Sequence, residues 1–271
     1  MLRKVAVLFA LILAFPLAAQ AAFKKDAPTV LVTGANRGIG LELAKQYAAA
    51  NWNVIATTRR PLDDAGVADL RELAKKYPQV ALERIDVTDT AMIRSVAQKY
   101  QDQPLDVLIN NAAAVEATFQ ADLAKLNIPY DKLDYDDARH DFDVNTLGPM
   151  RMVQAFEPNV ERSKQKKIVN VTSFVGSFAK TFPNASGMNY AASKAALNMY
   201  SVKLSYALKP KGVIVSLVEP ILVASKPGVS DIPMASPLNV EIAKLLKVID
   251  KLTMDSTGKI TNFSTGQIDP F

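Results

Sequence analysis

The chain of 271 residues contains no cysteine and a single histidine, His140. The lack of cysteine excludes disulfide bonds, thiolate nucleophiles and cysteine-ligated metal sites. One histidine argues against a serine–histidine triad and against a metal site with several imidazole ligands. We therefore predict no bound metal ion, and we expect any catalytic proton transfer to depend on other residue types.

The sequence also lacks a dense run of one charge. Its formal net charge is +5, but lysine and arginine are distributed along the whole chain. This distribution is typical of a solvated basic surface and differs from the basic patch of a protein that binds nucleic acid. We predict no nucleic-acid partner.

The apolar stretch near the amino terminus, Val5 to Leu17, is shorter than the ~20 residues that span a bilayer. It follows two basic residues and precedes a small-residue sequence that ends at Ala21. This pattern is typical of a secretory signal peptide. We expect residues 1–21 to direct export to the periplasm or the medium, with an uncleaved membrane anchor as the alternative, and residues 28–271 to form one domain.

From Thr29 onward, short β-branched runs alternate with longer stretches that carry apolar residues at helical spacing. The alternation predicts an α/β fold, a doubly wound parallel sheet with crossover helices on both faces in three α/β/α layers. After Pro220 the pattern loosens and predicts a mobile loop. The predicted strands are Thr29–Thr33, Asn53–Thr58, Val80–Asp86, Leu105–Asn110, Lys167–Thr172 and Val213–Val218, and the predicted helices are Ile39–Ala50, Ala65–Lys76, Thr90–Gln101, Asp137–Glu157 and Asn189–Leu208.

Three glycines lie where the first predicted strand leads into the first predicted helix. Gly34 permits a tight turn, Gly38 lets the backbone approach a pyrophosphate, and Gly40 lets the helix pack against the strand. The amino end of the helix favours the anion. We therefore predict that a dinucleotide binds here. The predicted contacts are Gly34, Asn36, Arg37, Gly38, Ile39 and Gly40.

The end of the second predicted strand indicates which dinucleotide binds. NAD enzymes usually place a carboxylate there, but this chain has Arg59 and Arg60. Guanidinium groups can hold a 2′-phosphate through paired hydrogen bonds, and Arg37 adds another cation. We predict NADP(H) as the cofactor, with NAD(H) as the alternative, and Arg59 as a contact.

Tyr190 and Lys194 lie four positions apart in a predicted helix, so they project from one face. A free tyrosine has a pKa of ~10, and a nearby ammonium group lowers the pKa by stabilising the phenolate. The pair therefore predicts a proton donor for a carbonyl group, with the pKa of Tyr190 below its ordinary value.

The Thr-Gly-x-x-x-Gly-x-Gly spacing at Thr33–Gly40, together with Tyr190 and Lys194, resembles the short-chain dehydrogenase/reductase family. The resemblance extends from Thr29 to the carboxyl terminus. Val144–Pro149 and Gly258–Phe271 resemble the branch that includes C-factor and related carbonyl reductases. The family implies a Rossmann-type fold, a small-molecule carbonyl or alcohol substrate, hydride transfer, and often a homodimer or homotetramer.

The resemblance also implies roles for further residues. Tyr190 and Lys194 would contact the nicotinamide ribose as well as act in catalysis, and Asn145 would order a water-linked proton relay. Other positions would lie along the cofactor. These are Asp86 and Val87 at the adenine edge, Asn111 on the nicotinamide side, and Ser225, where a threonine often meets the carboxamide.

The catalytic serine has two candidates. Ser173 ends the fifth predicted strand, where the family places it, but it precedes Tyr190 by more residues than is typical. Ser177 has the typical spacing. We favour Ser173 because Lys180–Gly187 resembles an inserted loop, and insertions in loops are tolerated more readily than shifts of strands.

These observations predict an NADP(H)-dependent oxidoreductase with Ser173, Tyr190, Lys194 and Asn145 as its proton relay. A non-catalytic protein that binds a dinucleotide on the same fold is the alternative. We expect the substrate pocket to be lined by the segments around Val115–Tyr135 and Ile221–Pro237.

Overall fold

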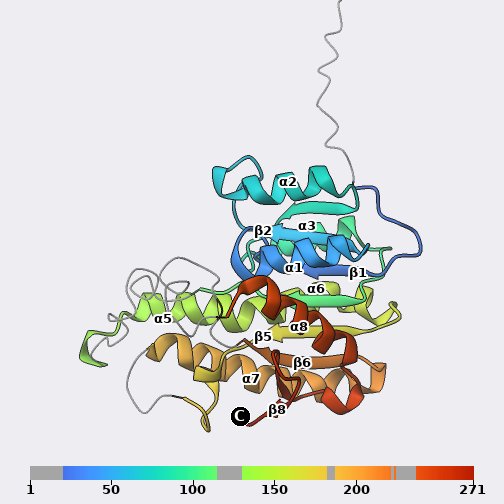
Figure 1. Ribbon diagram of the computed structural model, residues 1–271. Helices are drawn as coiled ribbons and strands as arrows, with labels where there is room; N and C mark the ends of the chain where they lie inside the picture. Colours follow the sequence, from blue (N-terminus) through green and yellow to red (C-terminus); the bar gives the residue numbers. More distant parts are fainter. Residues whose placement is uncertain (1–20, 115–129, 182–186, 221–222, 224–235) are drawn as a thin grey trace, which may run out of the picture.

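The computed structural model describes residues 21–114, 130–181, 187–220, 223 and 236–271 (Figure 1). The predicted signal peptide lies outside the described residues except for Ala21, so export and anchoring stay predictions. None of the helices in the described part of the chain is both long and apolar enough to cross a bilayer.

Eight strands form one sheet in the order β3-β2-β1-β4-β5-β6-β7-β8. Every neighbouring pair is parallel except β7 and β8, which are antiparallel. This arrangement confirms the predicted α/β fold and adds an antiparallel edge. The strands are β1 (Thr29–Val32), β2 (Asn53–Thr58), β3 (Val80–Arg84), β4 (Val107–Asn110), β5 (Lys167–Val171), β6 (Ile214–Glu219), β7 (Ile260–Asn262) and β8 (Ile268–Asp269).

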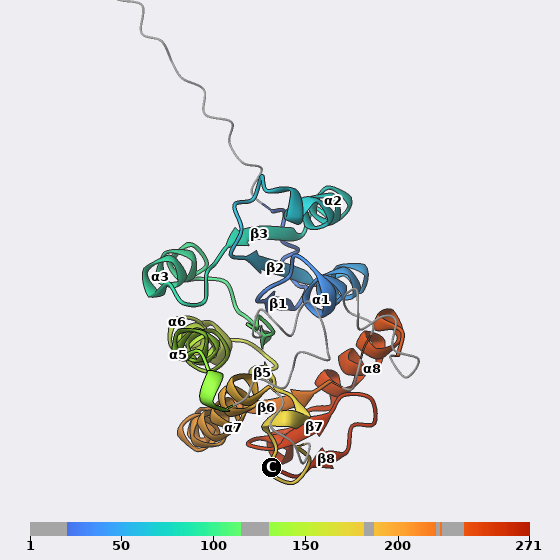
Figure 2. The ribbon, with the colours of Figure 1, turned by 90° about the vertical axis from the view of Figure 1, so that its left-hand side faces the viewer.

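Helices cover both faces of the sheet, α1, α2 and α8 on one side and α3, α6 and α7 on the other (Figure 2). The α-helices are α1 (Gly38–Ala49), α2 (Ala68–Lys76), α3 (Thr90–Lys99), α5 (Tyr135–Phe142), α6 (Gly148–Glu161), α7 (Met188–Leu208) and α8 (Leu238–Lys251). Short 3₁₀ turns are η1 (Ala65–Val67), η3 (Tyr130–Lys132), η5 (Phe174–Gly176), η6 (Lys209–Lys211) and η7 (Met254–Ser256), and Asp143–Leu147 is π-helical.

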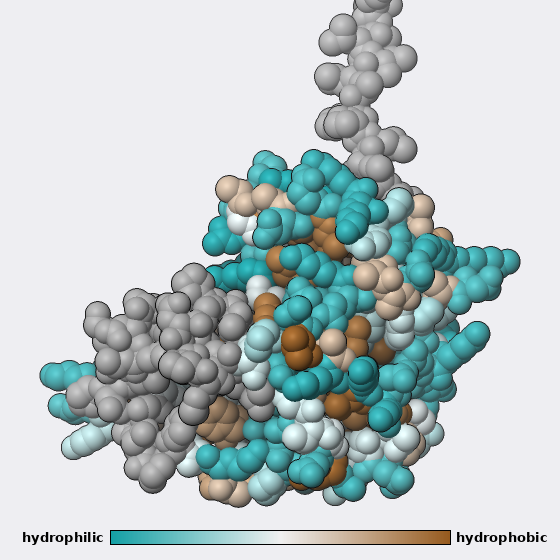
Figure 3. Space-filling view, viewed as in Figure 1, coloured by the Kyte–Doolittle hydropathy of each residue, from teal (hydrophilic) through white to brown (hydrophobic). Residues whose placement is uncertain are grey.

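The β-branched runs of the sequence are explained by burial on both faces of the sheet. In β1, Val30 and Val32 pack with α1 and α8 on one side, whereas Leu31 packs with α3 and α6 on the other. Successive strand residues point to opposite faces of the sheet. Because helices cover both faces, every residue of such a strand is buried, and apolar residues are favoured at successive positions. On the outside, hydrophilic residues cover most of the face seen in Figure 3, and hydrophobic residues lie between them in separate small areas.

The predicted helix Asp137–Glu157 is interrupted in the structure. It begins earlier, at Tyr135, and Asp143–Leu147 takes a π-helical register between α5 and α6. Pro149 accounts for the change, because it has no N–H to donate to the carbonyl of Asn145 four residues earlier. The prediction of one regular helix was therefore wrong at this point.

The end of the chain is more ordered than the sequence pattern suggested. Most of the loop predicted after Pro220 lies outside the described residues, but α8, β7 and β8 follow it. In α8, Ile242, Leu245 and Ile249 are buried at helical spacing. This signal was present in the sequence but was obscured by the nearby prolines and glycine.

Candidate active site

The glycine loop has the geometry that dinucleotide binding needs. Gly34 and Gly38 have φ angles of +66° and +55°, which residues other than glycine rarely adopt. A Cβ atom at Gly40 would lie 2.3 Å from the carbonyl oxygen of Gly34, so the helix packs directly against the turn. No side chain caps the amino end of α1. Its first amides are therefore available to an anion, and these residues fit the pyrophosphate of a dinucleotide.

The carboxyl end of β4 supports this loop. Asn111 donates from Nδ2 to the carbonyl oxygens of Thr33, at 2.9 Å, and Gly34, at 3.3 Å. In return, the hydroxyl of Thr33 accepts hydrogen bonds from the amides of Asn111 and Ala112. The side chain of Asn111 is thus committed to holding the glycine loop, and its direct contact with the nicotinamide stays a prediction.

The predicted arginines differ in their surroundings. Arg60 is paired with Asp64 at 3.1 Å. The guanidinium groups of Arg37 and Arg59 are exposed and make no hydrogen bond or ion pair with any residue that the structure describes. Asn36 donates to the carbonyl of Gly66 at 3.2 Å. Arg37 and Arg59 are therefore free to bind a phosphate.

Asp86 follows β3 and lies near the guanidinium group of Arg59. Burial acts to raise its pKa, but hydrogen bonds from Thr88 and the charges of Arg59 and His140 hold the pKa below its ordinary value. The cap of the next helix is Asp89, which accepts from the amide of Met92. Asp86 is therefore an ionised carboxylate at the sheet edge and does not cap α3. Its neighbour Val87 is buried against Gly148.

The structure brings Ser173 and Tyr190 together. Ser173 follows β5 in extended conformation, and its side chain lies close enough to that of Tyr190, near the start of α7, to lower the pKa of the phenol. The hydroxyl of Ser177 instead donates to the carbonyl of Pro270, near the carboxyl terminus, at 3.0 Å. Of the two candidate serines, Ser173 is therefore the one whose side chain lies near Tyr190, and its catalytic role stays a prediction.

Lys194 lies one turn after Tyr190, with its Nζ 5.6 Å from the centre of the tyrosine ring. The ammonium group is buried and donates to the carbonyl oxygen of Val171 at 2.9 Å. Burial lowers the pKa of Lys194 to about 8, although the charge of Asp141 acts in the opposite direction. Lys194 is thus directed at the end of β5.

The predicted lowering of the Tyr190 pKa is not found in this structure. Burial raises the pKa of Tyr190 to about 12, the nearby hydroxyl of Ser173 lowers it in part, and the negative charge of Asp141 raises it further. The reason is that desolvation of the phenolate outweighs the distant ammonium group of Lys194, which is bonded to a backbone carbonyl. Tyr190 therefore keeps its proton at neutral pH.

Asn145 lies in the π-helical segment and is fully buried. Its Nδ2 donates to the carbonyl of Ala114, at 2.8 Å, and to the hydroxyl of Ser193, at 3.0 Å, while its Oδ1 accepts from the amide of Ala114. Ser193 in turn donates to the carbonyl of Tyr190 at 2.7 Å. Asn145 thus connects the segment after β4 with the first turn of α7.

Sequence reasoning missed Asp141. This carboxylate is buried in α5, one turn before Asn145, and its charge acts on both Tyr190 and Lys194. The only signal was a charged residue four positions before a buried asparagine in a predicted helix. Ser225, by contrast, lies outside the described residues.

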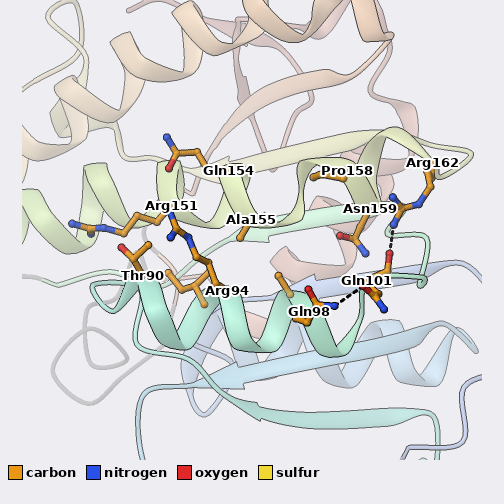
Figure 4. A pocket seen from close by; sticks show the side chains of 12 residues that line it. Thr90, Arg94, Gln98, Gln101, Arg151, Gln154, Ala155, Pro158, Asn159 and Arg162 are labelled. Carbon is orange, nitrogen blue, oxygen red and sulfur yellow. Dashed lines mark hydrogen bonds between the residues drawn. The ribbon is translucent and has the colours of Figure 1, made fainter.

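A polar groove of about 440 Å³ between α3 and α6 contains none of the predicted site residues (Figure 4). Arg94 and Arg151 lie toward one end and Arg162 toward the other. Arg151 is bonded to Asp143 at 2.6 Å, and Arg162 to the carbonyl of Gln101. Among the described residues there is also no cluster of three or more potential metal ligands. The candidate site is therefore the edge formed by the glycine loop, Ser173 and Tyr190.

Comparison with known proteins agrees with this geometry. The family model for short chain dehydrogenase matches residues 28–231. An uncharacterized oxidoreductase of Schizosaccharomyces pombe is 30% identical over 258 residues, covering 89% of this chain and 96% of the relative. C-signal of Myxococcus xanthus is 32% identical over 178 residues, which are 65% of this chain and 99% of that protein. The crystal structure of an NADPH-bound carbonyl reductase from chicken fatty liver matches with a TM-score of 0.76 at 26% identity, covering 90% of this chain and 99% of the other. The chain therefore belongs to the short-chain dehydrogenase family of oxidoreductases.

Proposed function

We propose that the protein is an NADP(H)-dependent oxidoreductase that interconverts a carbonyl group and an alcohol of a small molecule. The observation that carries the proposal is the close approach of the side chains of Ser173 and Tyr190, with Lys194 one turn further along α7. Two adjacent hydroxyl groups at the carboxyl edge of the sheet can both contact one substrate oxygen. This is the arrangement that carbonyl reduction needs.

The bound nicotinamide would supply hydride to the substrate carbon, or accept it in the reverse direction. Ser173 holds the substrate oxygen, and Tyr190 transfers its proton to that oxygen. Because the pKa of Tyr190 is raised to about 12, the donor is protonated at neutral pH. As the family resemblance implies, Lys194 would hold the nicotinamide ribose, and Asn145 would help to return a proton to Tyr190 through water.

The preference for NADP(H) is supported by the guanidinium groups of Arg37 and Arg59, which form no ion pair within the described part of the chain. They lie on the segments that follow β1 and β2, two strands that are neighbours in the sheet. A 2′-phosphate between them would gain charge-assisted hydrogen bonds that a bare 2′-hydroxyl would not. The chicken carbonyl reductase named above was crystallised with NADPH, which agrees with this preference.

We also propose that residues 1–21 export the protein and that it assembles as a homo-oligomer. Assembly is supported by apolar side chains that are exposed on α5 and α7, which pack on each other. These are Tyr135, Phe142, Met199 and Tyr206. Sedimentation of the purified protein would measure the oligomeric state, and the amino-terminal sequence of the exported protein would locate the cleavage.

The test of the proposed function is a titration of the purified protein with NADPH and with NADH, followed by turnover on a panel of aldehydes and ketones. We expect tighter binding of NADPH and reduction of at least one carbonyl. Tyr190→Phe should bind NADPH as the wild type does but lose turnover by about 10²–10⁴-fold. Tyr200→Phe, at an exposed position of the same helix, is the matched control and should retain turnover.

Binding of NADPH without turnover on any carbonyl would support the non-catalytic alternative. Binding of neither cofactor would exclude both functions.

A further inference from the structure

The face of α7 that meets the sheet is polar. Its buried residues include Ser193, Lys194, Asn198, Ser201 and Ser205. Buried polar side chains need hydrogen-bond partners, and those of Lys194, Asn198 and Ser201 include groups on β5 and on the segment after it. Lys194 donates to Val171, and Ser201 accepts from Asn170 at 2.8 Å. Hydrogen bonds as well as apolar packing therefore hold α7 on the sheet.

Asn198 occupies the middle of this face and contacts both sides of Ser173. Its Oδ1 accepts from the hydroxyl of Thr172, the residue before Ser173, at 2.5 Å. Its Nδ2 donates to the carbonyl of Gly176, three residues after Ser173, at 3.0 Å. Thr172, Gly176 and Asn198 are all buried. One amide group thus joins the two ends of the segment that carries Ser173 to the helix that carries Tyr190.

The 3₁₀ turn after Ser173 closes on itself and lies directly against α7. The amide of Gly176 donates to the carbonyl of Ser173 at 3.0 Å. A Cβ atom at Gly176 would lie 2.7 Å from the Cβ of Lys194 and 2.8 Å from its backbone carbon. The turn is therefore as close to α7 as its backbone permits, and the Asn198 amide bonds it at that distance.

We propose that Asn198 is a positioning residue that sets the separation between the hydroxyl groups of Ser173 and Tyr190. The proposal rests on the proposed function, in which both hydroxyl groups contact one substrate oxygen. Without the amide, the Thr172 hydroxyl and the Gly176 carbonyl lose their partner on α7, and the Ser173 segment can move away from Tyr190. A displacement of about 1 Å in a catalytic group can reduce the rate about 10²-fold.

The experiment compares Asn198→Ala with Ser201→Ala in the full-length protein. Ser201 is the matched control, because it is buried on the same face of α7 and bonds β5 without touching the Ser173 segment. We expect Asn198→Ala to lower kcat about 10–100-fold with the NADPH Kd changed less than about threefold, and Ser201→Ala to keep kcat within about threefold. If the two variants had equal kcat values, Asn198 would not position Ser173.

A second readout does not depend on turnover. Hydrogen exchange of the backbone amides of Gly176 and Ser177, measured without cofactor, should be faster in Asn198→Ala than in Ser201→Ala or the wild type. Equal exchange in all three proteins would overturn the proposal. If the wild type proved inactive, the proposed function would fail, whereas the exchange result would still test the link between Asn198 and this segment.

Thr172→Val is the second variant, in case Asn198→Ala does not fold. It removes one hydroxyl, nearly keeps the shape of the side chain and leaves the bond from Asn198 to Gly176 in place. We expect a loss of kcat that is smaller than in Asn198→Ala but larger than in Ser201→Ala. If only Thr172→Val folds, a kcat equal to that of Ser201→Ala overturns the proposal. Thr172→Val and Asn198→Ala together should lose less than the sum of the two single effects on the free-energy scale, because both remove the same contact. Additive losses would contradict the proposal.

Discussion

The side chain of Ser173, which follows β5, lies close enough to the phenol of Tyr190, in the first turn of α7, to lower the pKa of that phenol. Ser177, which has the spacing typical of the family, is instead bonded to Pro270 near the carboxyl terminus. The position of a residue at the end of a strand therefore decides its neighbours more directly than its distance along the sequence.

This relationship predicts opposite outcomes for two serine substitutions. Ser173→Ala should lower kcat by about 10²-fold, because it removes a hydrogen bond to the substrate oxygen. Ser177→Ala should keep kcat but reduce the free energy of unfolding by about 1 kcal/mol, because only a buried hydrogen bond is lost. Steady-state kinetics and urea unfolding of both variants provide the check. Loss of kcat in Ser177→Ala alone would reverse the assignment.

Cofactor preference is predicted to depend on Arg59. Arg59→Ala should raise the Kd for NADPH about 10–100-fold, because one charge-assisted contact to the 2′-phosphate is lost. The Kd for NADH should change little. Arg60→Ala is the control, since Arg60 is already paired with Asp64. Fluorescence titration of the wild type and both variants with each cofactor measures the Kd values, and a parallel loss of NADH affinity would indicate a structural effect.

Asp141 is predicted to control the pKa of Tyr190. Burial is the main cause of the raised pKa of about 12 and the negative charge of Asp141 adds to it, so Asp141→Asn should lower the pKa of Tyr190 by part of the shift. An ultraviolet titration of tyrosinate, with Asp141→Asn/Tyr190→Phe as the reference, isolates the single phenol. Asp137→Asn, exposed on the same helix, should leave the titration unchanged. An unchanged pKa in Asp141→Asn would show that the carboxylate does not act on Tyr190.

The strands and the glycine loop were predictable from the sequence because their signals are local. A β-branched run such as Asn53–Thr58 is buried on both sides wherever it lies in the sheet, and its bounds agree with the structure. Likewise Gly34, Gly38 and Gly40 each meet a steric requirement of a single turn.

Other features could not be predicted from the sequence, and most of these depend on contacts between segments that are distant in the chain. The pKa of Tyr190 depends on how deeply α7 is buried and on a carboxylate from α5, and neither can be read from the Tyr-x-x-x-Lys spacing. Asn198 is one polar residue in a helix until its partners on the Ser173 segment are known. Strand β7 has three residues and β8 two, which is too short for a recognisable period.

Burial of the Lys194 ammonium group is expected to reduce the free energy of unfolding at neutral pH. In the folded protein the pKa of Lys194 is lowered to about 8, from the ordinary value of 10.5. The unfolded chain therefore binds more protons than the folded chain between about pH 8 and pH 10.5, so this residue makes folding more favourable as pH rises through that window. Below about pH 8 the unfavourable contribution is complete, and it corresponds to roughly 3 kcal/mol at most.

Lys194→Met should therefore stabilise the fold at pH 7 while removing activity. Loss of the hydrogen bond to Val171 offsets about 1 kcal/mol, so we expect a net gain of about 1–2 kcal/mol in the free energy of unfolding. The gain should shrink by pH 10, because Lys194 is then largely neutral in the folded wild type. Urea unfolding of both proteins at the two pH values measures this difference, in which all other titrating groups cancel. A variant that is less stable than the wild type at pH 7 would mean that the ammonium group is stabilised by its surroundings, and the fold would then gain from the residue that the proposed chemistry requires.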